Sequence, residues 1–291
     1  MPDPLPLTFP PGDAIDPGAV PTRALGPFAS DDEAHQAMPQ IAAELVKHQT
    51  FLMAHEAYGV LVLFQGMDGS GKDEAIRDAL AALDPRGTAY RQFKRPQGEE
   101  KRHDYLWRVH AAVPKRGEVG IFNRSHYEQV VGERLHPEAL DEQGLPAEAR
   151  EGDVWARRHR QINDFERYLA ENGVVVLKFF MHVSKDVQRE RLLERTDRPE
   201  EKWQFSASDV KERQRWDEYT SVYGDVLTAT NTAWAPWLVV PADWPWVARA
   251  VVGRAIADRL RALHEDFPLV TEEQERELAE ARRALEAEVA P

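Results

Sequence analysis

The chain has 291 residues, ample for a complete hydrophobic core, and its 42% hydrophobic and 30% charged residues are ordinary for a soluble globular protein. It contains no cysteine, which excludes disulfides, thiolate zinc sites and cysteine nucleophiles. The net charge of −13 argues against a nucleic-acid-binding protein, since a phosphate backbone requires basic surface. No apolar run has the length of a membrane span or resembles a signal peptide, so we expect a cytoplasmic protein with no membrane contact.

Residues 1–30 hold eight prolines, a composition that does not form a helix. We expect them to form an extended arm that packs on the surface or stays mobile. The helical spacing of Ile41 and Leu45 then predicts a first helix over residues 31–58.

The run at residues 60–65 is apolar without polar alternation, which is typical of a strand buried on both faces of a parallel sheet. A glycine-rich loop follows it, and Ile76, Leu80 and Leu83 then share one face of a helix over residues 73–83. This order of strand, loop and helix is the context that a phosphate-binding loop requires.

Strands and helices continue to alternate along the rest of the chain. Further strands are expected at residues 88–93, 119–123, 174–183 and 237–240. Further helices are expected at residues 153–171, 185–194, 210–222, 245–263 and, as a charged tail, 271–289. The alternation predicts an α/β fold of three αβα layers around a central parallel five-stranded sheet.

Residues 66–72 fit the pattern G-x-x-x-x-G-K. Glycines let backbone N–H groups turn inward and cradle phosphate oxygens, and the following helix presents its N-terminus to the anion. We therefore predict phosphate binding by Gly69, Ser70, Gly71, Lys72 and Asp73, with the lysine neutralising charge on the transferred phosphoryl group. The alternative is a chance match in a turn, against which the flanking strand and helix argue.

Two acidic residues set this loop apart, because Asp73 stands where serine or threonine usually ligates magnesium and Asp68 lies inside the loop. Phosphate repels a nearby carboxylate unless a metal lies between them, so the pair predicts a bridging metal or a catalytic base. Asn123 ends a predicted strand, where an acidic residue usually orients magnesium. We expect Mg²⁺, with Mn²⁺ as an alternative, to be held by Asp68, Asp73 and Asn123. An ordinary strand-to-loop turn is the other interpretation of Asn123 and Arg124.

Basic residues follow the second predicted strand and precede the third. Lys94 and Arg95 lie where ligands bind in open α/β sheets, and we expect Lys115 and Arg116 to extend the same phosphate-binding surface. The alternative for each of the four is a solvated charged face.

An arginine-rich segment follows the fourth predicted strand. Its composition is typical of a lid, at about residues 186–215, that closes over phosphates and supplies charge to the transition state. Arg191 and Arg195 are spaced to share one helix face. The alternative is salt bridging with Glu190 and Glu194.

Taken together, these motifs resemble the polyphosphate kinase 2 family. The matching stretches are residues 66–73 (GMDGSGKD), 93–96 (FKRP), 121–128 (IFNRSHYE), 160–166 (RQINDFE), 199–206 (PEEKWQFS), 231–232 (NT) and 241–243 (PAD). They occur in the family's order, and an aspartate after the loop lysine is itself a family trait.

The resemblance implies a thymidylate-kinase-like P-loop fold with a helical lid. It implies a kinase domain over residues 31–266, between the arm at 1–30 and a charged helix within 267–291. It also implies reversible, magnesium-dependent transfer of phosphoryl groups between inorganic polyphosphate and nucleotides, in a homo-oligomer (dimer or tetramer). The family's catalytic residues correspond to Asp68, Lys72, Arg124, Arg191 and Arg195, and less closely to Arg198.

Two positions depart from the common family pattern: Asn123 replaces an aspartate of many members, and Glu74 stands where glycine is common. The segment 123–128 resembles the subgroup that accepts both AMP and ADP. We therefore expect stepwise phosphorylation of AMP to ADP and ATP, with guanine nucleotides as further candidates. Asn123, Glu128 and Arg198 are the candidate determinants of nucleotide choice.

Two other functions fit parts of the pattern: an ATP-dependent nucleoside monophosphate kinase, and a P-loop protein that senses nucleotides without turnover. The basic run from Lys94 to Arg116 favours an anion longer than ATP. Lid arginines argue against binding without turnover. A phosphate acceptor is already ionised at pH 7, so the expected reaction needs positioning and charge rather than a strong general base.

Overall fold

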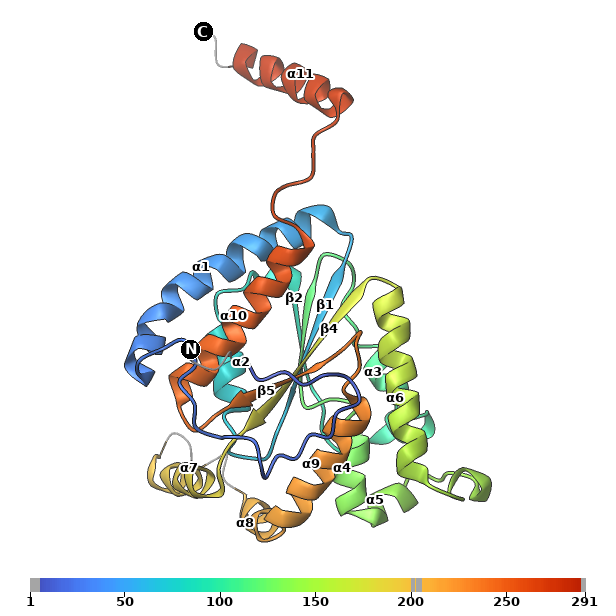
Figure 1. Ribbon diagram of the computed structural model, residues 1–291. Coiled ribbons are helices and arrows are strands. Elements are labelled where there is room, and N and C mark those ends of the chain that lie inside the picture. Colours follow the sequence, from blue (N-terminus) through green and yellow to red (C-terminus); the bar gives the residue numbers. More distant parts are fainter. Residues whose placement is uncertain (1–5, 200–201, 203–205, 289–291) are drawn as a thin grey trace.

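Five parallel strands form the central sheet of the computed structural model, which describes residues 6–199, 202 and 206–288. The strands are β1 (Gly59–Gln65), β2 (Thr88–Gln92), β3 (Val119–Asn123), β4 (Val174–His182) and β5 (Trp237–Pro241). They lie in the order β2-β3-β1-β4-β5, and each neighbouring pair is parallel (Figure 1). The predicted five-stranded parallel sheet is confirmed.

Strand β1 shows why the sheet needs helices on both faces. All seven of its residues are buried. Val60, Val62 and Phe64 enter one core, whereas Leu61 and Leu63 enter the other. Because both faces of the strand are dry, its sequence is an unbroken apolar run.

Among the described residues, helices cover both faces of the sheet (Figure 1). On the first face lie α1 (Asp31–His55), α2 (Lys72–Leu80) and α10 (Pro245–Leu263). On the second lie α3 (Trp107–His110), α4 (Glu128–Leu135), α6 (Val154–Glu171) and α9 (Trp216–Thr230). Shorter pieces are α5 (Pro137–Asp141) and the 3-10 turns η1 (Pro85–Gly87), η2 (Gly98–Arg102) and η3 (Ala147–Ala149). The predicted three-layer architecture is therefore present.

The arm packs along the edge strand β5. Leu7 pairs with Val239 in an antiparallel bridge, with an N–O distance of 2.8 Å. The Nδ2 of Asn231 donates to the carbonyl of Phe9 at 2.9 Å, and Ile15 is buried in the second core. The arm thus pairs with an edge that would otherwise expose unpaired backbone groups.

One predicted helix is wrong. The expected helix at 210–222 is two helices, α8 (Ala207–Gln214) and α9, with a break at Arg215. Together with α7 (Lys185–Asp197), α8 makes up the region predicted as a lid. Most of the family-like stretch 199–206 lies outside the described residues, which include only its positions 199, 202 and 206.

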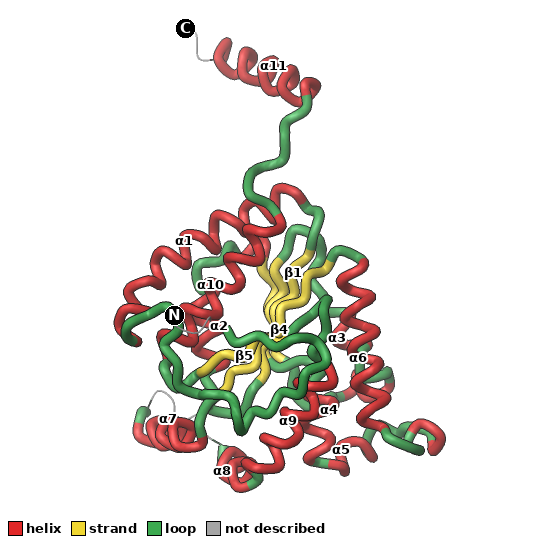
Figure 2. Tube along the Cα trace, viewed as in Figure 1, coloured by secondary structure: helices red, strands yellow, loops and turns green. Residues whose placement is uncertain are grey.

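Helix α11 (Glu272–Glu288) stands away from the body of the protein, joined to α10 by an extended segment (Figure 2). Each of its residues is exposed. Within the described part of the chain, none of the helices combines the length and hydrophobicity needed to cross a bilayer.

Candidate active site

The glycine-rich loop joins the carboxyl end of β1 to the start of α2. Gly66, Gly69 and Gly71 all have positive φ, at 144°, 78° and 89°. At Gly66, a Cβ would lie 2.6 Å from the carbonyl oxygen of Met181 on β4, so the loop can approach the sheet this closely only with glycine. The conformation turns the loop over the N-terminus of α2, where unpaired N–H groups attract an anion.

Lys72 is buried within this loop. Its Nζ donates to the carbonyl oxygens of Gly66 at 2.5 Å and Met67 at 2.8 Å. Burial lowers the pKa of Lys72 below its ordinary value, and Asp68 opposes that shift. The ammonium group therefore lies inside the loop that is expected to enclose the phosphoryl group.

Arg124 contacts two acidic residues, Asp68 in the loop and Glu128 at the start of α4. Its Nη2 lies 2.6 Å from Oδ1 of Asp68, and its Nη1 lies 3.5 Å from Oε2 of Glu128. Burial would raise the pKa of Asp68, but Arg124 and Lys72 outweigh that effect and hold the pKa below its ordinary value. The pKa of Arg124 is itself raised, chiefly by Glu128. Its φ of +59° is unusual for a residue with a side chain, and such strain is typical of functional sites.

A hydrogen bond joins Asn123, at the end of β3, to Asp73, which follows the loop lysine. The Nδ2 of Asn123 donates to Oδ1 of Asp73 at 2.6 Å and to the hydroxyl of Tyr90 at 3.1 Å. This orientation, assigned from the hydrogen bonds, leaves the amide oxygen of Asn123 available as an acceptor. Tyr90 was not among the predicted site residues because β2 carries no motif that would mark it.

The residues predicted to hold a metal fit a magnesium ion that is bound mainly through its substrate. Asp68 and Asp73 each have one carboxylate oxygen outside the contacts just described, and Asn123 offers an amide oxygen. Mg²⁺ prefers such oxygen ligands and usually takes only one or two carboxylates beside substrate phosphates. The described residues contain no cluster of three or more His, Cys, Asp or Glu side chains able to hold a metal alone.

Helix α7 contacts the loop directly. Nη1 of Arg191 donates to the carbonyl of Gly69 at 3.2 Å, and Nη2 donates to the carbonyl of Ala242 at 2.6 Å. Gln188 of the same helix donates to the carbonyl of Asp68 at 2.7 Å. For Arg191, the structure thus favours the loop over the alternative of a helix salt bridge.

The other two arginines of this segment differ from Arg191. Arg198 pairs with Glu194 at 3.4 Å, which is the salt bridging weighed as the alternative for this segment. Arg195 is half-buried, and it lines an opening beside the loop together with Arg191.

The structure does not bring Lys115 and Arg116 to the loop. They lie just before β3, whose first residue Val119 pairs with Val60 near the start of β1. A Cβ at Gly59 would lie 3.0 Å from the carbonyl of Lys115. The loop follows the opposite, carboxyl ends of the strands, so the prediction that this pair extends the phosphate surface is wrong.

Lys94 and Arg95 do lie beyond the carboxyl end of β2, as predicted. Arg95 is tied to Glu142, at 2.7 Å between Nη2 and Oε1. The same carboxylate pairs with Lys101 at 3.2 Å. Arg95 therefore lies in a surface ion-pair cluster.

Of the openings that the described residues form at the P-loop, two differ clearly in chemistry. We call the first the arginine groove: it has a volume of about 480 Å³ and is lined by Gly69–Gly71, Glu74, Glu194, Trp246 and the arginines Arg77, Arg191, Arg195, Arg198 and Arg249. We call the second the tyrosine pocket: it has a volume of about 50 Å³ and its lining includes Gly66–Asp68, Arg124, Glu128, Asp209, Tyr219 and Tyr223. Arg77, Arg249 and the two tyrosines were missed by sequence reasoning, because they belong to α2, α10 and α9 and meet the loop only in space.

Comparison with known proteins identifies the family. The family model described as polyphosphate kinase 2 matches residues 28–268. The chain belongs to the polyphosphate kinase 2 family. The resemblance seen in the motifs is confirmed.

Relatives within the polyphosphate kinase 2 family cover most of the chain. An ADP-polyphosphate phosphotransferase from Rhodopseudomonas palustris is 38% identical over 275 residues, which are 94% of this chain and 95% of that protein. An AMP/ADP-polyphosphate phosphotransferase from Meiothermus ruber is 40% identical over 233 residues, 80% of this chain and 83% of that protein. The crystal structure of polyphosphate kinase 2 from Arthrobacter aurescens TC1 has a TM-score of 0.84 at 33% identity, covering 96% of this chain and 98% of that one.

Proposed function

We propose that this polyphosphate kinase 2 family member transfers phosphoryl groups reversibly between inorganic polyphosphate and the nucleotides AMP and ADP. The observation that carries the proposal is a P-loop flanked by two openings of different chemistry, the arginine groove and the tyrosine pocket. A phosphotransferase needs donor and acceptor sites that meet at one phosphoryl group. The names of the relatives from R. palustris and M. ruber support these substrates, and a relative named GDP-polyphosphate phosphotransferase supports guanine nucleotides as further candidates.

The arginine groove is the proposed donor site. It brings four arginines from α2, α7 and α10, and Arg198 just after α7, together against two glutamates, so its charge favours a polyanion. Arg249 and Arg77 both contact Asp78, at 2.8 Å and 2.6 Å, so one carboxylate holds both guanidinium groups. This groove replaces the run from Lys94 to Arg116 as the reason to prefer a donor longer than ATP.

The tyrosine pocket is the proposed site of the acceptor phosphate, because its volume of about 50 Å³ suits a phosphate group and not a whole nucleotide. Arg124 faces it from the end of β3, and Tyr219 and Tyr223 face it from α9. Glu128 lines this pocket and pairs with Arg124, so it remains a candidate determinant of nucleotide choice. Arg198 lines the arginine groove instead, and we therefore assign it to the donor side.

The chemistry follows from these positions. Backbone N–H groups of the loop and Lys72 hold the phosphoryl group being transferred, and Arg124, Arg191 and Arg195 stabilise the charge that spreads over its oxygens. A bound Mg²⁺ would neutralise phosphate charge, held by Asp68, Asp73 and Asn123. The nucleotide phosphate attacks in its ionised form, so no side chain has to remove a proton from it.

A donor experiment tests the proposal. The protein is incubated with AMP, medium-chain polyphosphate and Mg²⁺ in the absence of ATP, and ADP and ATP are measured over time. We expect both products, and Lys72→Ala, as the control, should make neither. Activity with ATP as the donor but not with polyphosphate would indicate a nucleoside monophosphate kinase. Nucleotide binding without product from either donor would indicate a sensor.

We also propose that the protein is a homo-oligomer to which α11 contributes. Leu278 and Leu285 lie seven residues apart on this exposed helix, and 62% and 63% of their surface is accessible. Such a pair suits helix pairing between copies. Light scattering of the full chain and of a form ending at residue 266 tests this: the same number of subunits in both forms would contradict the role of α11.

A further inference from the structure

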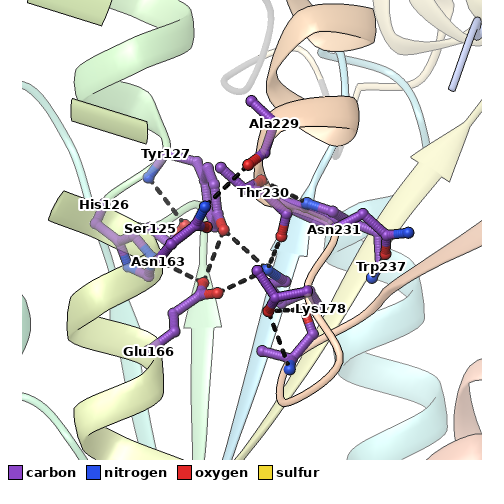
Figure 3. A network of polar contacts seen from close by, with 12 residues as sticks. Ser125, His126, Tyr127, Asn163, Glu166, Lys178, Ala229, Thr230, Asn231 and Trp237 are labelled. Carbon is purple, nitrogen blue, oxygen red and sulfur yellow. Dashed lines mark hydrogen bonds and ion pairs between the residues drawn. The ribbon is translucent and has the colours of Figure 1, made fainter. Parts of the chain in front are cut away.

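An ion pair lies at the centre of the second core. Nζ of Lys178 on β4 is 2.7 Å from Oε2 of Glu166 on α6, and neither side chain has any accessible surface. The two form the middle of a network of polar groups (Figure 3). The rings of Tyr127 and Trp237 lie 5.4 Å and 5.0 Å from the ammonium group.

Each charge of the pair makes two further hydrogen bonds. Oε1 of Glu166 accepts from the hydroxyl of Tyr127 at 2.7 Å and from Nε2 of His126 at 3.2 Å. Nζ of Lys178 donates to the same hydroxyl at 3.0 Å and to the carbonyl of Thr230 at 2.7 Å. The network therefore joins α6 and β4 to the turn after β3 and to the last residue of α9.

Stability alone does not account for this network. Removing two charges from water costs several kcal/mol per ion, so a buried ion pair is often no more stabilising than apolar side chains of the same volume. Burial lowers the pKa of Lys178, while Glu166 opposes the shift. What a charged network adds over an apolar core is a single fixed geometry, because hydrogen bonds are directional and a displaced charge is penalised.

The geometry that it fixes is that of Arg124. His126 and Tyr127 follow this residue in the chain by two and three positions. Arg124 has a strained φ of +59°, and such a conformation persists only where its surroundings hold it. On the sheet side, its N–H donates to the carbonyl of Phe64 at 3.1 Å. On the other side of Arg124, the network holds His126 and Tyr127.

At its other end, the network fixes α9. Lys178 caps the last carbonyl of the helix, and Oγ1 of Thr230 accepts from Nε1 of Trp237 at 2.9 Å. The same helix carries Tyr219 and Tyr223 into the tyrosine pocket. Arg124 and these tyrosines thus face one pocket from two elements that meet at one buried ion pair.

We propose that Glu166, Lys178 and Tyr127 are positioning residues for phosphoryl transfer, which set Arg124 and α9 relative to the P-loop. The proposal rests on the proposed function for its kinetic consequences. It concerns no contact with substrate: the effect passes through Arg124.

The first test replaces Tyr127 with phenylalanine, which removes the shared hydroxyl and keeps the ring. The matched control is Tyr105→Phe, which removes a hydroxyl bonded to Gln161 at 3.1 Å beside the same core. At a temperature where all forms are folded, we expect Tyr127→Phe to lower kcat about tenfold, because Arg124 is held less firmly where it stabilises the transition state, with KM for polyphosphate unchanged. Tyr105→Phe should keep both values.

If Tyr127 had only a structural role, its loss would lower stability and turnover independently of Arg124. The second test is therefore a double-mutant cycle of Tyr127 and Arg124. In an Arg124→Lys background, the loss caused by Tyr127→Phe should fall to about twofold or less, because the group that the hydroxyl positions is no longer present. An equal loss in both backgrounds, or a kcat of Tyr127→Phe within twofold of wild type, would overturn the proposal.

A third measurement separates this proposal from the proposed function. Hydrogen exchange of the Arg124 amide should be about tenfold faster in Tyr127→Phe than in Tyr105→Phe, because the turn is held less firmly. Wild-type protein without polyphosphate-dependent turnover would count against the function. Unchanged exchange at Arg124 would count against the positioning role, whatever the turnover.

Discussion

Replacing Arg124 with alanine is the sharpest perturbation of the candidate site. The change removes the guanidinium group that lies 2.6 Å from Asp68 and 3.5 Å from Glu128. It leaves the two carboxylates facing the pocket where a nucleotide phosphate is proposed to bind. Alanine keeps a Cβ, so the strain at a φ of +59° is the same in both forms.

The expected effects on folding and on catalysis differ in size. The side chains of Arg124 and Asp68 are each 37% exposed, so solvent screens the pair and its loss should cost about 1 kcal/mol or less of folding free energy. An arginine that stabilises a phosphoryl transition state contributes about 10³-fold to 10⁵-fold in rate. That range corresponds to about 4–7 kcal/mol of activation free energy. Catalysis should therefore be lost while the fold is kept.

The assay measures ATP formed from ADP and polyphosphate, together with the melting temperature. Arg134→Ala is the matched control. Arg134 of α4 makes a similar ion pair, at 2.6 Å, with Asp225 of α9, and neither residue lines the arginine groove or the tyrosine pocket. We expect Arg124→Ala to lose at least about 10³-fold in turnover and the control to lose little. Turnover of Arg124→Ala within tenfold of the control would refute the role assigned to Arg124.

Three further predictions follow from the same geometry. Arg249→Ala should raise KM for polyphosphate several-fold and leave KM for the nucleotide unchanged. The control, Arg254→Ala on the exposed face of α10, should change neither KM. Equal effects of Arg249→Ala on both KM values would contradict the assignment of the arginine groove to the donor. Asn123→Asp should place two carboxylates in contact, so its melting temperature should rise more on adding Mg²⁺ than that of wild type; an equal rise would argue against metal binding there. Because the folded-state pKa of Asp68 is depressed, its ionised form stabilises the fold above about pH 4, and the contribution is lost as the pH falls through the lower folded value. The difference in melting temperature between wild type and Asp68→Asn should therefore shrink below about pH 4, and a constant difference would contradict the pairing with Arg124.

Much of the architecture was predictable because its signals are local. The apolar run of β1 and the glycines of the loop determine their own conformation over a few residues. The family motifs are short segments of this kind, so they identified the family before the fold was known. Glu166 and Lys178 are also part of the chain's ordinary strand and helix patterns, but nothing local marks them as a buried pair.

The sequence by itself therefore determined the parallel sheet, the phosphate loop and the family. Only the tertiary structure decided which charges share a surface. Lys115 lies near β3 in the chain but at the wrong end of the sheet, because a strand separates its two ends by about 3.3 Å per residue. Arg77 and Arg249 are far apart in the chain, yet both contact Asp78 and line one groove. Electrostatic interactions depend on distance in space, and sequence spacing gives that distance only within a single element.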